Sequence, residues 1–206
     1  HLHGLSRQEL TDAGEDPDEP GGYFIINGTE KVLITIEDLA SNKFLIERRT
    51  SGTSEFVGKL FSEYGSFKIP HTMEKPKDGI FYLTFTRVKK IPIIVVIKAL
   101  GLLKDEEITR FISDKNQYDE VIINLIEFAS IKTVEEALDY IAKKVGVTQS
   151  KEIRIERMSE ILDKYLMPHL GIKKEDMISK AYNLCKMIKR FLRVSRGELN
   201  TDDKDH

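Results

Sequence analysis

The chain has 206 residues, of which 40% are hydrophobic, so it is long enough to bury a real core in one or two domains. Its 32 Lys and Arg nearly balance its 34 Asp and Glu, which excludes overall charge as the force that holds a nucleic acid or an anionic membrane. The single Cys185 excludes an internal disulfide and fits a reducing compartment, and no apolar run approaches the roughly 20 residues of a membrane-spanning helix.

The N-terminal part of the chain predicts an exposed loop followed by a β-hairpin. Residues 14–22 are acids, Pro and Gly, which offer no apolar face to bury. Two β-rich runs, residues 23–26 and 31–36, flank Asn27 and Gly28, a pair that readily takes the positive φ angles of a tight hairpin turn. Because apolar residues occupy both faces of the second run, we expect this strand to be covered on most of both faces and to need a larger sheet.

The middle of the chain predicts a small antiparallel sheet, and the remainder predicts helices. Residues 56–64, 66–69 and 80–86 show short β-type alternation separated by turns. From Ile94 onward the pattern is helical, with Gly101 as the first stop. Apolar residues at three- and four-residue spacing then predict helices over residues 106–113, 118–128, 133–145, 150–165 and 173–192.

Two local patterns refine the helical predictions. Thr133 followed by Glu136 has the order of a capping box, so a helix should begin at 133. The last helix carries an apolar stripe and, towards its C-terminal end, a row of cations. That row suits the negative pole of the helix dipole, but cations that share a helical face are also the better candidates for phosphate contact. The row consists of Lys186, Lys189, Arg190, Arg193 and Arg196.

Further cations occur in two short groups at the ends of expected strands. These are Arg48 with Arg49, and Arg87 with Lys89 and Lys90. They could contact phosphates, but exposed cations are the default surface of a soluble protein. Solvated side chains are therefore the favoured interpretation of both groups.

The histidines do not predict a metal site or a catalytic site. His1 and His3 form a His-x-His pair that has no third ligand nearby in the sequence. His71 and His169 are isolated, and His169 follows a proline at an expected helix end, where capping or packing is a commoner role than general-base catalysis. The sequence also lacks a zinc-protease helix, a CxxC pair, a phosphate-binding loop and a Gly-x-Ser-x-Gly elbow.

The C-terminal residues are acidic. Asp202, Asp203 and Asp205 with His206 could form a Mg²⁺ cluster, because hard cations prefer several oxygen ligands. Adjacent acids in a tail are usually just solvated, and that interpretation is favoured. We therefore predict no catalytic and no metal-binding residue, and composition and spacing alone indicate an α+β domain with no nameable activity.

One segment carries a much more specific signal. Residues 21–34, GGYFIINGTEKVLI, closely resemble the GGYFIINGxEKVLI segment of the second-largest subunits of multisubunit RNA polymerases from the archaeal and eukaryotic branch. Three further stretches follow in the family's order. Residues 91–101 resemble IPIxxxxxALG, residues 162–170 resemble LxxxxLPH with Met167 before the proline, and residues 202–206 resemble DDxDH. Together these stretches span nearly the whole chain.

The resemblance implies a mainly helical lobe domain with a small antiparallel sheet, plus a β-hairpin that belongs to the adjacent protrusion. By it, residues 1–52 belong to the protrusion segment, residues 53–192 to the lobe, and residues 193–206 to a return into the rest of the subunit. In the family, lobe and protrusion form one wall of the DNA cleft, and transcription factors dock on the lobe. The implied role is scaffold and channel in a nucleotidyltransferase whose catalytic residues lie elsewhere.

The same resemblance implies the partners: the other polymerase subunits, especially the largest, the DNA template and transcription factors, without a membrane. No cofactor is expected in this chain, while Mg²⁺ and Zn²⁺ are expected elsewhere in the polymerase. The Lys-, Ile- and Glu-rich composition resembles archaeal proteins, which implies a cytoplasmic location, or a nuclear one if the chain is eukaryotic. The alternative is a free-standing protein-interaction or nucleic-acid-binding module.

Overall fold

The computed structural model describes residues 4–113 and 118–202. The chain divides into two compact units, residues 1–38 and residues 39–206. We call them unit 1 and unit 2 and describe each by itself. Unit 2 begins earlier than the predicted boundary between residues 52 and 53, because residues 44–48 form a strand of its sheet. The assignment of the two units to protrusion and lobe stays a prediction.

Unit 1 contains a short helix and a two-stranded antiparallel sheet. Helix α1 (Arg7–Asp12) begins at a capping box formed by Ser6 and Glu9. Strands β1 (Tyr23–Ile26) and β2 (Thr29–Val32) are joined at Asn27 and Gly28, both with positive φ. The predicted hairpin is therefore confirmed, although its second strand lies earlier than expected.

The apolar side chains of this hairpin and of the segment after it are exposed to solvent. Ile25 is 69% exposed, and Leu33, Ile34 and Ile36 are each more than three quarters exposed. Nothing in the described part of the chain covers the second strand, so the expectation that it needs a larger sheet to cover both faces stays a prediction. Among the described residues, no third strand pairs with this two-stranded sheet.

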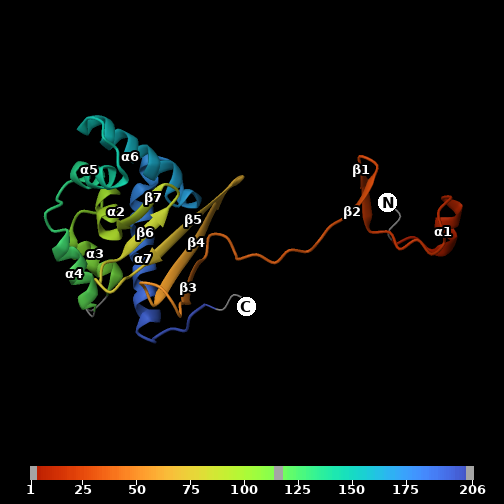
Figure 1. Cartoon of the computed structure of the whole chain (residues 1–206), viewed down its shortest axis with the longest axis horizontal. Helices are drawn as coiled ribbons and strands as arrows, with labels where there is room; N and C mark the ends of the chain where they lie inside the picture. The colour runs from red at the N-terminus through yellow and green to blue at the C-terminus, as the bar shows by residue number, and fades with distance from the viewer. Residues whose placement is uncertain (1–3, 114–117, 203–206) are drawn as a thin grey trace. The chain divides into compact units, whose positions relative to one another are not determined.

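Unit 2 contains a five-stranded antiparallel sheet in which the strands follow one another in chain order (Figure 1). The strands are β3 (Phe44–Arg48), β4 (Phe56–Tyr64), β5 (Phe67–Glu74), β6 (Tyr82–Phe85) and β7 (Val88–Pro92). The predicted small antiparallel sheet is confirmed. It is larger than predicted, because β5 continues to Glu74 and because β3 and β7 add strands that the sequence did not predict.

Helices follow the sheet in the chain and lie together beside it (Figure 1). They are α2 (Ile93–Ala99), α3 (Asp105–Ile112), α4 (Asp119–Glu127), α5 (Val134–Val145), α6 (Lys151–Tyr165), the 3-10 turns η1 (Pro168–Leu170) and η2 (Lys174–Asp176), and α7 (Met177–Ser195). The predicted helices are confirmed, and so is the α+β class. The capping box of Thr133 and Glu136 forms as the sequence indicates.

One hydrophobic core joins the sheet to the helices. Every residue of α2 is buried, and α7 contacts both α2 and the sheet strands β3 and β4. The rings of Phe81 and Phe191 meet edge to face with centroids 5.9 Å apart, which ties the sheet side to α7. This packing fixes the orientation of α7, whose outer face carries the predicted cations.

Two lysines are buried beneath helix ends. The ammonium of Lys98 donates to the carbonyl of Phe128, just past α4, at 3.1 Å. Lys180 donates to the carbonyls of Leu162 and Asp163 at 3.2 and 2.8 Å in the last turn of α6, where the carbonyl of Leu162 also accepts from the N–H of Leu166 at 3.3 Å. Burial lowers the pKa of Lys180, the negative charge of Asp163 opposes this shift, and the resulting pKa is about 8. These cations act as internal caps.

Candidate nucleic-acid interface

Helix α7 is amphipathic along its whole length. Its inner face places Ala181, Cys185, Ile188 and Leu192 in the core with no exposed surface. Burial also raises the pKa of the Cys185 thiol to about 12, so this cysteine is an inert packing residue. The predicted cations occupy the opposite side of the helix, which makes that side the first candidate for contact with phosphates.

The structure brings carboxylates of the same chain to three of the five predicted cations. Arg190 pairs with Asp202 at 2.6 Å, Arg193 with Glu198 at 3.4 Å, and Arg196 with Glu120 at 2.6 Å. Lys186 is exposed and Lys189 is half-buried. Part of the row therefore stabilises the fold through ion pairs within the chain. The sequence alone had left open whether these cations interact with the helix dipole or contact phosphates. A contact of these residues with nucleic acid or with another subunit stays a prediction.

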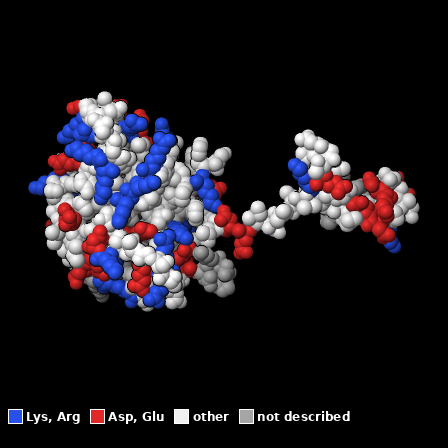
Figure 2. Space-filling model, viewed as in Figure 1, with Lys and Arg blue, Asp and Glu red and all other residues white. Residues whose placement is uncertain are grey.

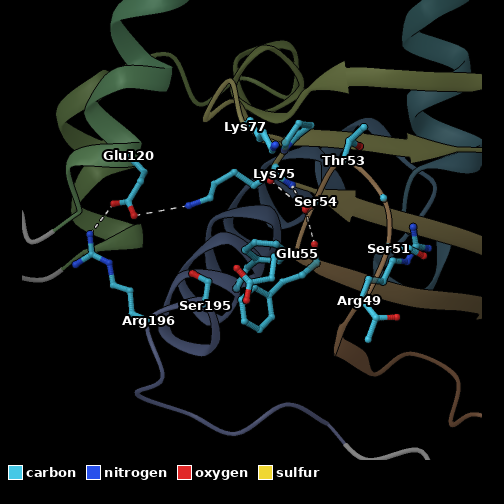
Figure 3. A pocket seen from close by; sticks show the side chains of 15 residues that line it. Arg49, Ser51, Thr53, Ser54, Glu55, Lys75, Lys77, Glu120, Ser195 and Arg196 are labelled. Atoms are coloured by element: carbon cyan, nitrogen blue, oxygen red, sulfur yellow. Dashed lines mark hydrogen bonds and ion pairs between the residues drawn. The ribbon is translucent and has the colours of Figure 1, made fainter.

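An open hollow of about 510 Å³ adjoins the C-terminal end of α7 (Figure 3). Its walls come from the loop between β3 and β4, the residues that follow β5, the start of α4 and the last turn of α7. Figure 3 shows Arg196 and Lys75 directed towards Glu120 from two different walls. Four cations line the hollow, namely Arg49, Lys75, Lys77 and Arg196.

Glu120 forms ion pairs with two of the four cations that line this hollow. Its carboxylate lies 2.6 Å from Arg196 and 3.7 Å from Lys75. Burial raises the pKa of Glu120, but backbone hydrogen bonding and the Arg196 guanidinium outweigh it, so the net pKa is lowered. The carboxylate stays ionised and neutralises part of the local positive charge. A phosphate at this position would compete with Glu120, so any such contact is weak.

Ser54 fixes one wall of the hollow. Its hydroxyl donates to the carbonyl of Phe56 at 2.6 Å and accepts from the N–H of Lys75 at 3.1 Å. The loop between β3 and β4 is thereby tied to the end of β5. Sequence reasoning missed Ser54, Lys75 and Glu120, because single polar residues at distant positions give no local pattern.

Asp202, the last described residue, is not simply solvated. The N–H of Asp202 donates to the carbonyl of Ile46 at 2.9 Å, and its carboxylate accepts from the N–H of Ile46 at 2.8 Å. The same carboxylate accepts from Arg190. The solvated-tail interpretation is therefore wrong for Asp202, which holds the chain against β3. Asp203, Asp205 and His206 lie outside the described residues.

The two internal histidines are packing residues with defined partners. His169 Nδ1 lies 2.7 Å from the hydroxyl of Ser62, which is fully buried, and the N–H of His169 donates to the same oxygen. His71 bridges the carbonyl of Ile69 and the N–H of Met167. A Ser–His pair can activate a nucleophile, but a buried hydroxyl cannot reach a substrate. His1 and His3 lie outside the described residues.

Comparison with known families identifies the family of the chain. Residues 41–206 match the family model of RNA polymerase Rpb2, domain 2. The chain belongs to the RNA polymerase Rpb2 domain 2 family. The resemblance to second-largest polymerase subunits, first carried by four short motifs, is thereby confirmed. The hollow and the helix face described above lie within the matched residues.

Archaeal proteins are similar to the chain over its whole length. It is 43% identical to the DNA-directed RNA polymerase subunit Rpo2N of Methanocaldococcus jannaschii over 211 aligned residues, which cover all of this chain and 42% of that protein. It is 40% identical to Rpo2 of Saccharolobus solfataricus, over 96% of this chain and 18% of that protein. Rpo2N of Halobacterium salinarum is 37% identical, over 100% of this chain and 40% of that protein. The chain thus spans less than half the length of these relatives. Among residues 4–113 and 118–202, no helix is long and apolar enough to cross a membrane.

Proposed function

We propose that this chain is part of the second-largest subunit of an archaeal DNA-directed RNA polymerase, where it lines the DNA cleft and contributes no catalytic residue. Its partners are the other polymerase subunits, the largest above all, and the DNA template. Transcription factors dock on its helical unit. The polymerase works in the cytoplasm, and its metal ions are held by other parts of the enzyme.

The observation that carries the proposal is the family membership over residues 41–206, together with the similarity to polymerase subunits along the whole chain. The surface charge supports it. A cleft wall along which DNA slides should contact phosphates weakly and without reading bases. A row of cations partly neutralised by Glu120, Glu198 and Asp202 suits such weak contact.

The proposal is tested by charge reversal in the assembled polymerase. Lys186→Glu with Lys189→Glu reverses two charges of the predicted row and keeps the ion pairs of Arg190, Arg193 and Arg196 with Asp202, Glu198 and Glu120. Each lost phosphate contact should reduce the slope of log K against log salt by about 0.9. DNA retention is measured at several salt concentrations.

The matched control is Lys132→Glu with Lys151→Glu, which reverses the same charge at two exposed positions outside α7. Its salt dependence should equal that of the unchanged polymerase. If the α7 pair also leaves DNA retention unchanged at every salt concentration, α7 does not face DNA.

A further inference from the structure

Two adjoining hollows flank the last turn of α6. The first lies between that turn and the hairpin that joins β4 to β5, has a volume of about 340 Å³, and is lined almost entirely by carbon. Phe67 is 72% exposed, Tyr64 53% and Tyr165 41%. Its main lining residues are Tyr64, Phe67, Ile69, Tyr165, Pro168 and Ile172. We call this the apolar hollow.

The second hollow is cationic. It has a volume of about 370 Å³ and lies between α6 and the turn from β6 to β7. Arg87, Arg157 and Lys164 line it together with a single carboxylate, Glu160. All three cations are exposed, and none forms an ion pair with a carboxylate in the part of the chain that the structure describes. On the face of unit 2 that Figure 2 draws, Lys and Arg side chains gather over α5 and α6. We call this the cationic hollow.

The two hollows form one surface. Lys164 and Tyr165, consecutive residues at the end of α6, line both of them. The cations here differ from those of α7, where Arg190, Arg193 and Arg196 are paired within the chain. An apolar recess with aromatic walls beside exposed cations is complementary to an apolar side chain flanked by carboxylates.

We propose that this surface binds an acidic segment of a partner protein, with a Phe or Leu side chain in the apolar hollow and Asp or Glu side chains on Arg87 and Arg157. The guanidinium group suits this role, because its planar fork matches a carboxylate with two parallel hydrogen bonds. The inference deepens the factor-docking part of the proposed function and rests on it only for the identity of the partner.

The surface favours an acidic peptide over nucleic acid for a physical reason. A base stacked in the apolar hollow would bury its hydrogen-bonding edge against a wall with almost no polar groups, which is unfavourable. A Phe or Leu side chain has no such groups.

The test uses the 206-residue chain and a fluorescent probe peptide of about ten residues in which one Phe and one Leu are flanked by Asp and Glu. Binding is followed by fluorescence anisotropy. Phe67→Ser and Arg157→Glu should each weaken binding by roughly tenfold, because each removes one half of the contact. Both residues are exposed, and circular dichroism confirms that the variants are folded.

The matched controls are Ile153→Ser and Lys151→Glu, which make the same changes at exposed positions of α6 outside both hollows. Both should bind the probe like the unchanged chain. A peptide with Ala in place of Phe and Leu, and one with Gln and Asn in place of the acids, should each bind roughly tenfold more weakly.

The inference is overturned if the unchanged chain does not bind the probe, or if the controls weaken binding as much as Phe67→Ser and Arg157→Glu. It is also overturned if single-stranded DNA displaces the peptide and loses affinity on the same substitutions, since the surface would then be a nucleic-acid site. None of these outcomes touches the proposed place in the polymerase, which is tested separately by DNA retention of the α7 variants.

Discussion

The Nε2 atom of His71 accepts a hydrogen bond of 3.0 Å from the backbone N–H of Met167, although the two residues lie 96 positions apart. Nδ1 of the same ring lies 3.0 Å from the carbonyl of Ile69. A neutral imidazole with its proton on Nδ1 satisfies both groups, whereas a protonated ring would place an N–H against that of Met167. Met167 has a φ of 42°, so this bond helps to hold a conformation that non-glycine residues seldom adopt. The sheet thereby positions the segment after α6.

Acid should destabilise the protein through His71. Burial lowers its pKa from 6.5 to about 4, so the unfolded chain binds more protons than the folded chain in that window. This contribution to stability is complete above pH 6.5 and is lost as the pH falls towards 4, by about 3 kcal/mol in total. His169, whose pKa is lowered by burial and by Lys180, acts in the same direction. Urea unfolding at a series of pH values measures the effect.

The variant His71→Phe separates the ionisation from the packing. It keeps an aromatic ring against Phe85, whose centroid lies 5.5 Å from that of His71, but leaves the N–H of Met167 without its acceptor. Unfolding at pH 7 should become about 2 kcal/mol easier, because a buried donor is unsatisfied. The pH dependence between 6.5 and 4 should become shallower. An unchanged slope would show that His71 is not the titrating group.

Gly58 is required by the ring of Phe44. A side chain on Gly58 would meet that ring directly: Phe44 pairs with Leu60, two residues further along β4, and its ring reaches over Gly58. Gly58→Ala should therefore lower the free energy of unfolding by about 2 kcal/mol through overpacking. In a double-mutant cycle, Phe44→Ala should make the glycine substitution nearly neutral. Additive effects in the cycle would contradict this explanation.

Lys98 should be one of the most sensitive positions for stability. Its ammonium donates to the carbonyls of Phe128 and Ile131, and it lies 3.1 Å from Asp105. Lys98→Met should cost about 3 kcal/mol, because it leaves a partly buried carboxylate and two carbonyls without this partner. The exposed Lys132→Met is the matched control and should change stability little. Thermal unfolding of both variants provides the measurement.

Glu120 should limit the affinity of the hollow for phosphates. Glu120→Gln removes the negative charge that faces Arg196 and Lys75, so nonspecific DNA binding by the chain should strengthen and its salt slope should grow by about 1. Stability should fall by no more than about 1 kcal/mol, since both ion pairs are partly exposed. Glu135→Gln, at an exposed position of α5, is the control. Unchanged DNA affinity would remove the hollow as a phosphate contact.

The exposed apolar side chains of unit 1 should matter for assembly and not for folding of this chain. Ile34→Ser should leave thermal unfolding of the chain unchanged, because Ile34 is 77% exposed. In the full-length subunit the same change should reduce co-purification with the other polymerase subunits. A large loss of stability in the chain itself would show instead that Ile34 packs within it.

The sequence by itself determined those features that depend on neighbouring residues. Asn27 with Gly28 forms the hairpin turn, and Thr133 with Glu136 forms the capping box, because a few consecutive residues specify each geometry. Apolar spacing likewise located the helices, since the period of a helix is local. The motifs in residues 21–34 and the three later stretches indicated the family before any fold was known.

Only the tertiary structure decided which charges remain available. The sequence places Arg196 and Glu120 far apart, and chain folding brings them to 2.6 Å. Folding likewise brings Arg190 to Asp202. Arg157 shows the opposite outcome, because folding leaves it exposed and without an ion pair to a described carboxylate. The physical reason is that ion pairing depends on distance in space, which long-range packing sets, whereas a sequence pattern reports only which side of a helix a residue occupies.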